Sequence, residues 1–91
     1  MKEVRTGMTA VSMTGHDTGR YYIIVKTEGD YVYLADGRLR TLTRLKKKKR
    51  KHIQIDSHIV PEIRVLMEQD QELTNEVIKR VIKNRRRGQE V

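Results

Sequence analysis

Apolar residues in the first sixty positions alternate with polar ones or gather in short β-branched and aromatic runs, a pattern typical of strands. Five short strands are predicted, over residues 7–13, 21–26, 31–35, 38–43 and 52–56. Glycine-containing turns separate most of them, and short strands joined by tight turns favour an antiparallel arrangement, since parallel strands need long crossovers. The sequence therefore predicts a small antiparallel barrel or sandwich.

The fourth of these strands is the least regular. Asp36-Gly37 is a strong hairpin signal, after which the chain is expected to return as a strand over residues 38–43. Leu39 and Leu42 are the apolar members of this segment, but a spacing of three does not keep both on one face of a strand. Either a bulge separates them or one of them is partly exposed.

After residue 56 the apolar period changes from strand-like to helical. Asp56 or Ser57 is expected to cap a helix that has Pro61 in its first turn, and a second helix is expected to begin at Thr74. Helices this short are not stable alone, so their apolar stripes are expected to pack on the barrel or on each other. The predicted organisation is mainly β with an α appendage: a β-barrel over residues 1–57 and two short helices within residues 58–91.

Composition adds a strong positive charge. The chain has 20 Lys and Arg against 12 Asp and Glu, a net charge of +8 and a pI of about 10.1. Such a balance favours a polyanionic partner, either nucleic acid or an anionic membrane surface. The absence of cysteine excludes a disulfide framework and suits a reducing compartment. No run approaches the ~18 apolar residues of a membrane span, and a soluble cytoplasmic protein is expected.

The densest charge is the uninterrupted cationic run Lys46 to Lys51. Six such side chains repel one another and are expected to stay in water, as a basic loop between the fourth and fifth strands, until a polyanion neutralises them. Arg38, Arg40 and Arg44 stand just upstream of it. A further basic cluster in residues 79–87 either extends the same surface or complements the dipole of the second helix.

A family resemblance rests on residues 7–24, and above all on the hexapeptide Gly15-His16-Asp17-Thr18-Gly19-Arg20. This segment resembles the KOW motif of ribosomal and transcription-elongation proteins, although Thr18 stands where a lysine is common and Tyr22 where many members have glycine. The order of the later elements is similar to the L14e, L6e and L27e type of KOW ribosomal protein and to related small bacterial RNA-binding proteins. The resemblance implies an SH3-like β-barrel that binds RNA, with no known chemistry.

Charge and resemblance together predict a ribosome-associated RNA-binding protein of the translation apparatus, which docks its basic loop on the phosphates of ribosomal or other structured RNA. Ribosomal proteins are further candidate partners, DNA is a weaker candidate, and a membrane partner is not expected. The alternative is a protein–protein interaction module of the same SH3-like fold without an RNA role. The residues predicted to contact RNA are Arg20, Arg38, Arg40, Arg44, Lys46, Lys47, Lys48, Lys49, Arg50 and Lys51.

The glycine loop is expected to be structural and not catalytic. Gly15 and Gly19 supply backbone freedom, and Asp17 is expected to cap the turn by accepting backbone N–H bonds. The pair His16-Asp17, without a pocket or further partners, does not amount to an acid–base site. No metal site, cofactor or enzymatic activity is predicted.

The tyrosines leave two interpretations open. Tyr21 and Tyr22 must point to opposite faces of one strand, whereas Tyr31 and Tyr33 share a face. If the apolar residues beside the latter pair point inward, both rings lie outside. They then either stack on unpaired RNA bases or pack beneath the C-terminal helices.

Overall fold

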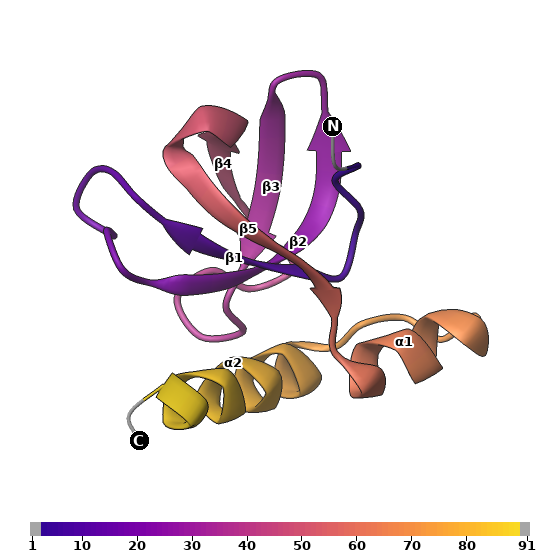
Figure 1. Cartoon of the computed structure of the whole chain (residues 1–91). Coiled ribbons are helices and arrows are strands. Elements are labelled where there is room, and N and C mark those ends of the chain that lie inside the picture. Colours follow the sequence, from indigo (N-terminus) through magenta and orange to yellow (C-terminus); the bar gives the residue numbers. More distant parts are fainter. Residues whose placement is uncertain (1–2, 90–91) are drawn as a thin grey trace.

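The computed structural model describes residues 3–89, with the backbone alone for residues 86–89. It contains a five-stranded antiparallel sheet followed by two helices (Figure 1). Four of the five predicted strands are confirmed in place, and the fourth is not. Within residues 3–89 no helix is both long and apolar enough to cross a membrane. The elements are β1 (Met8–Ser12), β2 (Tyr21–Glu28), β3 (Tyr31–Ala35), β4 (Lys46–Lys49), the 3-10 helix η1 (Arg50–His52), β5 (Ile53–Ile59), α1 (Pro61–Glu68) and α2 (Asn75–Gln89).

The sheet is strongly curled. Its strand order is β4-β3-β2-β1-β5, so β4 and β5 lie at opposite edges although the three residues of η1 join them directly. The edges of a flat five-stranded sheet would lie roughly 19 Å apart, which is four strand spacings of about 4.8 Å. A three-residue 3-10 segment spans only about 6 Å. The sheet must therefore bend, as Figure 1 shows, and one of its faces becomes concave.

Buried apolar side chains from four strands fill the concave face and are termed the inner core. Alternation along β3 shows how the sequence builds it, because Val32 and Leu34 are fully buried while Tyr31 and Tyr33 point the other way and are half-buried. Each large apolar side chain buried here contributes about 1.5–3 kcal/mol. The members of the inner core are Met8, Ala10, Tyr22, Ile24, Val32, Leu34 and Ile53.

The two helices cover part of the convex face and form a second cluster, termed the outer core. Ile23 and Ala35 point away from the inner core and meet apolar residues of α1 and α2 there. In Figure 1, α2 lies beneath the sheet at the end where β3 finishes, and the β2–β3 turn lies at the far end. The helices thus leave the convex face near that turn uncovered. The buried members of the outer core are Ile23, Ala35, Ile63, Ile78, Val81 and Ile82.

The start of α1 differs from the prediction. Pro61 occupies the first helical turn as expected, but the N-cap is Val60, which makes no side-chain cap hydrogen bond. The predicted caps Asp56 and Ser57 are wrong because β5 continues to Ile59. The strands therefore extend slightly beyond the predicted boundary at residue 57.

The start of α2 agrees with the prediction. The backbone N–H of Val77 donates to Thr74 Oγ1 at 3.2 Å, so the threonine hydroxyl satisfies one of the free donors at the helix N-terminus. Leu73 and Ile78, on either side of this cap, both pack in the outer core. The cap and the apolar contact together fix where the helix begins.

The predicted strand over residues 38–43 is wrong, since this segment is part of a loop between β3 and β4. Asp36 Oδ1 accepts hydrogen bonds from the N–H groups of Arg38 (2.8 Å) and Arg40 (2.9 Å). The N–H groups of Asp36 and Gly37 both donate to the carbonyl of Arg40. These bonds close a compact turn and occupy the backbone groups that a strand would offer to a neighbour.

The same loop is held against α2. Gly37 has a φ of 79°, and a Cβ at this position would lie 2.4 Å from the carbonyl oxygen of Asn75, so only glycine fits. The N–H of Leu42 donates to Asn75 Oδ1 at 2.9 Å, and the leucine side chain packs against the outer core. Leu39, in contrast, is 65% exposed. The unusual spacing of the two leucines thus reflects a loop with one exposed member.

Candidate nucleic-acid interface

The basic run is a strand followed by a short 3-10 helix, and not the predicted loop. Directly paired residues of neighbouring strands share a face of the sheet. Lys46 and Lys48 therefore point toward the inner core, and Lys47 and Lys49 point outward. The expectation that all six cations stay in water is wrong, because β4 divides its lysines between two faces. The observed pairs are Leu34 with Lys46, Tyr33 with Lys47, Val32 with Lys48 and Tyr31 with Lys49.

Lys48 is buried, with 9% of its surface exposed. Its ammonium group donates to Ser12 Oγ at 2.6 Å, to the carbonyl oxygen of Thr14 at 2.7 Å and to Asp17 Oδ1 at 2.7 Å. An ammonium group has three N–H donors, so every one of them is used. In this conformation Lys48 has no donor left for a phosphate, and its predicted role as an RNA contact is wrong.

Asp17 is the acceptor at the centre of this cluster. Ser12 Oγ donates to Oδ1 of Asp17 and the Tyr22 hydroxyl donates to Oδ2, each at 2.8 Å, while Lys46 Nζ lies 3.9 Å from Oδ2. The prediction that Asp17 caps the turn through backbone N–H groups is wrong, since its partners are side chains from three strands. The carboxylate instead ties the glycine loop to β4.

Asp17 keeps its charge despite burial. Burial alone raises the pKa of a carboxyl, but the hydrogen bonds from Lys48, Ser12 and Tyr22 and the charge of Lys48 outweigh this and hold the pKa of Asp17 well below its ordinary value of 3.8. Burial also raises the pKa of Tyr22 well above its ordinary value of 10, and the hydrogen bond to the carboxylate adds to the effect. Near neutral pH the cluster therefore consists of an ion pair and two neutral hydroxyl donors.

The glycines of the loop have the predicted role. Gly15 has a φ of 85° and Gly19 a φ of 88°, a region that other residues rarely occupy. The N–H of Gly19 donates to the carbonyl of Ser12 at 2.8 Å, which closes the loop between β1 and β2. His16 is exposed at the outside of this loop.

The convex side of β2, β3 and β4 gathers cations around two aromatic rings. Lys47 Nζ lies 4.4 Å from the ring centroid of Tyr31 and 5.9 Å from that of Tyr33, and Lys26 Nζ lies 5.4 Å from Tyr33. Such contacts at exposed sites are worth only about 0.5–1 kcal/mol, so the ammonium groups remain available to a stronger partner. This surface, made of Lys26, Tyr31, Tyr33, Lys47 and Lys49, is termed the outer lysine–tyrosine face.

The charges of this face are only partly compensated. Lys26 lies 3.6 Å from Glu28, and both side chains are largely exposed, so water screens the pair. Lys47 and Lys49 have no carboxylate within ion-pair distance among residues 3–85, whose side chains the structure describes. The face therefore offers two outward lysines that can bind an anion without first losing an acidic partner.

Arg50 and Lys51 continue the positive charge past the end of β4. The N–H of Arg50 donates to the carbonyl of Asp30 at 2.8 Å, which places η1 beside the β2–β3 turn. Both basic side chains are exposed. They extend the outer lysine–tyrosine face at the end that is farther from the helices.

The remaining arginines lie elsewhere and do not form one cluster with these residues. Arg38, Arg40 and Arg44 belong to the loop that α2 holds, at the opposite end of β3, with Arg40 partly buried. Arg20 is exposed directly before β2. The predicted RNA-contacting residues thus fall into a strand-based group and two peripheral groups.

Two arginines of α2 hold this helix in place. Arg80 donates to Glu62 of α1 through its Nε at 3.0 Å and pairs with the same carboxylate through Nη2. Arg85 pairs with Asp56 of β5. These two basic residues therefore have structural partners, whereas the side chains of residues 86–87 lie outside the described part of the chain.

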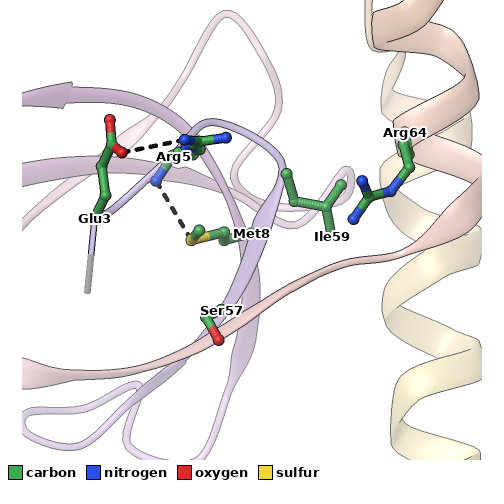
Figure 2. A pocket seen from close by; sticks show the side chains of 6 residues that line it. All are labelled: Glu3, Arg5, Met8, Ser57, Ile59 and Arg64. Carbon is green, nitrogen blue, oxygen red and sulfur yellow. Dashed lines mark hydrogen bonds and ion pairs between the residues drawn. The ribbon is translucent and has the colours of Figure 1, made fainter.

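A shallow hollow of about 340 Å³ lies between the N-terminal segment, β5 and α1 (Figure 2). Arg5 forms an ion pair with Glu3 at 3.1 Å at one side of it, and Arg64 of α1 lies at the other. Ser57 is the only hydroxyl among its lining residues, and none of them is a histidine or a lysine that would act as a general base beside it. The hollow adds two guanidinium groups to the surface at a distance from β4.

Sequence reasoning missed Lys26 and did not join the tyrosines to the lysine run. The alternation of Tyr31 and Tyr33 with apolar residues was recognised, but their partner strand was placed in residues 38–43. A strand of four consecutive lysines has no apolar signature, so the available signal was indirect: β3 needs an antiparallel partner, and the next extended segment is Lys46–Lys49.

No protein-family model matches the chain, and no curated protein has significant sequence similarity to it. The chemistry of the interface therefore has to be read from the geometry of its own residues.

Proposed function

We propose that this chain is an RNA-binding protein of the translation apparatus, with a KOW-type SH3-like barrel, that binds ribosomal or other structured RNA. The outer lysine–tyrosine face is the main contact, and Arg50 and Lys51 extend it. The observation that carries the proposal is that the inward and outward lysines of β4 differ in their acidic partners. Asp17 pairs with both inward lysines, and the outward pair has no acidic partner among the described residues.

The charge of the face suits a phosphate backbone. Each lysine that neutralises a phosphate releases condensed counterions, so affinity is expected to fall as salt rises, with a log–log slope of about 0.7 to 0.9 per contact. The net charge of +8 adds long-range attraction that speeds association. Affinity of this kind is compatible with many RNA sequences, and shape has to supply part of the selectivity.

A strand presents these lysines better than a loop would. The backbone of β4 is fixed by its ladder with β3, and Lys47 Nζ lies over two tyrosine rings. Less conformational entropy is then lost when the side chains meet phosphates. Lys48 contributes indirectly, because its ion pair with Asp17 anchors the strand from inside.

The test is binding of a labelled RNA hairpin with an unpaired loop, titrated at several salt concentrations. Lys47 and Lys49 are changed together to glutamine, and the matched control changes Lys79 and Lys83, two exposed lysines of α2, in the same way. Both variants lose the same charge. The first is expected to bind more weakly, with a salt slope lower by about 1.5, and the control is expected to change much less.

Equal losses in the two variants would show that only total charge matters, and unchanged binding in the first would remove the face from the mechanism. The link to translation is tested by sedimentation of the protein with ribosomes, with and without nuclease. A protein–protein interaction module without an RNA role would stay at the top of the gradient or ignore the nuclease.

A further inference from the structure

The four tyrosines have different surroundings, and only two lie outside both cores. Tyr22 is buried in the inner core with its hydroxyl on Asp17. Tyr21 packs against the outer core, which includes residues of both helices. Tyr31 and Tyr33 belong to neither core and stand half-buried on the convex face of β3. Of the two interpretations that the sequence left open, packing beneath the helices therefore applies to Tyr21 and not to Tyr31 or Tyr33.

Lysine ammonium groups lie over both of these rings. Lys47 Nζ is over both rings, at 4.4 Å and 5.9 Å from their centroids, and Lys26 Nζ is over Tyr33. One cation can lie over both rings because Tyr31 and Tyr33, two residues apart on β3, stand on the same side of the sheet. The lysines are long, flexible and solvated, so a flat ligand can displace them from the rings without disturbing a packed core.

We propose that Tyr31 and Tyr33 are a stacking platform for unpaired bases, so that the outer lysine–tyrosine face takes a single-stranded segment of its RNA. Bases stack on aromatic side chains regardless of sequence, while cations beside the rings bind the linking phosphates. Lys26, Lys47 and Lys49 stand beside the rings in the register of the sheet. The platform rests on the proposed function and specifies which part of a structured RNA it holds.

The spacing of the rings favours an unpaired segment over a duplex. Residues two apart on a strand lie about 6.8 Å apart, which is twice the ~3.4 Å separation of stacked bases. Two bases that each stack on one of the rings are therefore too far apart to stack directly on each other. A continuous duplex stack does not allow this arrangement, whereas a loop, bulge or end of a structured RNA does.

The experiment compares a labelled oligouridine with a fully paired RNA duplex of equal charge, using Tyr31→Leu and Tyr33→Leu. Tyr31→Phe and Tyr33→Phe are the matched controls, because they keep the ring and lose only the hydroxyl. Each leucine variant is expected to bind oligouridine about 5- to 100-fold more weakly with an unchanged salt slope, and each phenylalanine variant to bind within about twofold of the wild type. Far-ultraviolet circular dichroism confirms that the variants are folded.

A second readout needs no substitution. The chain contains four tyrosines and no tryptophan, so its intrinsic fluorescence comes from tyrosine, with Tyr31 and Tyr33 among the four emitters. Oligouridine is expected to quench this fluorescence more strongly than the duplex does. Leucine variants that bind as the wild type does, or a duplex that binds and quenches equally, would overturn the platform. The lysine variants would then still decide the proposed function. Tyrosine-dependent binding of an acidic peptide in place of oligouridine would also overturn it.

Discussion

The two faces of β4 both carry lysines, but among the described residues the lysines of one face have acidic partners and those of the other are exposed without them. On the concave side Lys48 is buried with all three N–H donors paired, and Lys46 lies close to the same carboxylate. On the convex side Lys47 and Lys49 are exposed and have no acidic partner among the described residues. The charge of a lysine therefore does not determine its role. The presence of a complete set of acceptors decides whether it stabilises the fold or stays free for a ligand.

The energetic difference between the faces follows from solvent. A buried ion pair costs desolvation of both groups and holds only if each remaining donor and acceptor is satisfied, as the cluster around Asp17 is. An exposed cation–π contact is made and broken at little cost. The inner cluster is thus expected to be essential for stability and the outer face to be nearly neutral for it.

The largest expected effect is on stability, when Lys48 is changed to methionine. This substitution keeps much of the side-chain volume but removes the counterion that is hydrogen-bonded to the buried carboxylate of Asp17, and only Lys46 at 3.9 Å remains near it. The expected cost is up to about 3–5 kcal/mol of unfolding free energy. Lys49→Met is the matched control on the other face of the same strand, with an expected change within about 0.5 kcal/mol. Urea unfolding measures both.

Similar losses in these two variants would show that the faces of β4 are energetically alike. A further check is the pair of changes Asp17→Asn and Lys48→Met in one chain. Because the double variant no longer buries a lone charge, it is expected to be more stable than the sum of the single effects implies, by about 0.5–3 kcal/mol.

A smaller effect on stability is expected when the pH is lowered, and Asp17 is the group whose protonation is expected to cause it. Its pKa is lower in the folded chain than its ordinary value of 3.8, so its contribution to stability is present above about pH 4 and is lost as the pH falls further. The stability difference between wild type and Asp17→Asn should be constant from pH 7 to about pH 5 and should narrow below pH 4. Urea unfolding across this range measures it, and a difference that does not narrow would contradict the assignment.

The contrast between the faces of β4 also explains what the sequence revealed and what it hid. The strand Tyr31–Ala35 was predicted with its observed bounds, because Val32 and Leu34 alternate with the tyrosines and this local pattern alone shows which residues face the core. Gly15 and Gly19 were assigned correctly for a similarly local reason, since positive φ restricts the residue type. These features depend on neighbours in the chain.

The lysine strand depends on a distant partner instead. Lys48 is acceptable inside the sheet only because Asp17, 31 positions earlier, meets it there, and no local pattern reports that contact. Asp36-Gly37 predicted a turn correctly. The backbone N–H groups of Arg38 and Arg40 donate to the Asp36 side chain, however, and the returning strand begins only at Lys46. The division of the lysines between core and interface was therefore beyond local reasoning.

Lys47→Gln is expected to have a small effect on stability and a clear effect on RNA binding. The change removes one exposed cation from the tyrosine rings, so the free energy of unfolding should fall by less than about 1 kcal/mol. The salt slope of RNA binding should fall by about 0.7 to 0.9, the share of one phosphate contact. Lys47→Arg keeps the charge and should keep the slope. If Lys47→Gln destabilised the fold as strongly as Lys48→Met, the convex face of β4 would be as important for stability as the concave face. If it left the salt slope unchanged, Lys47 would not contact phosphate.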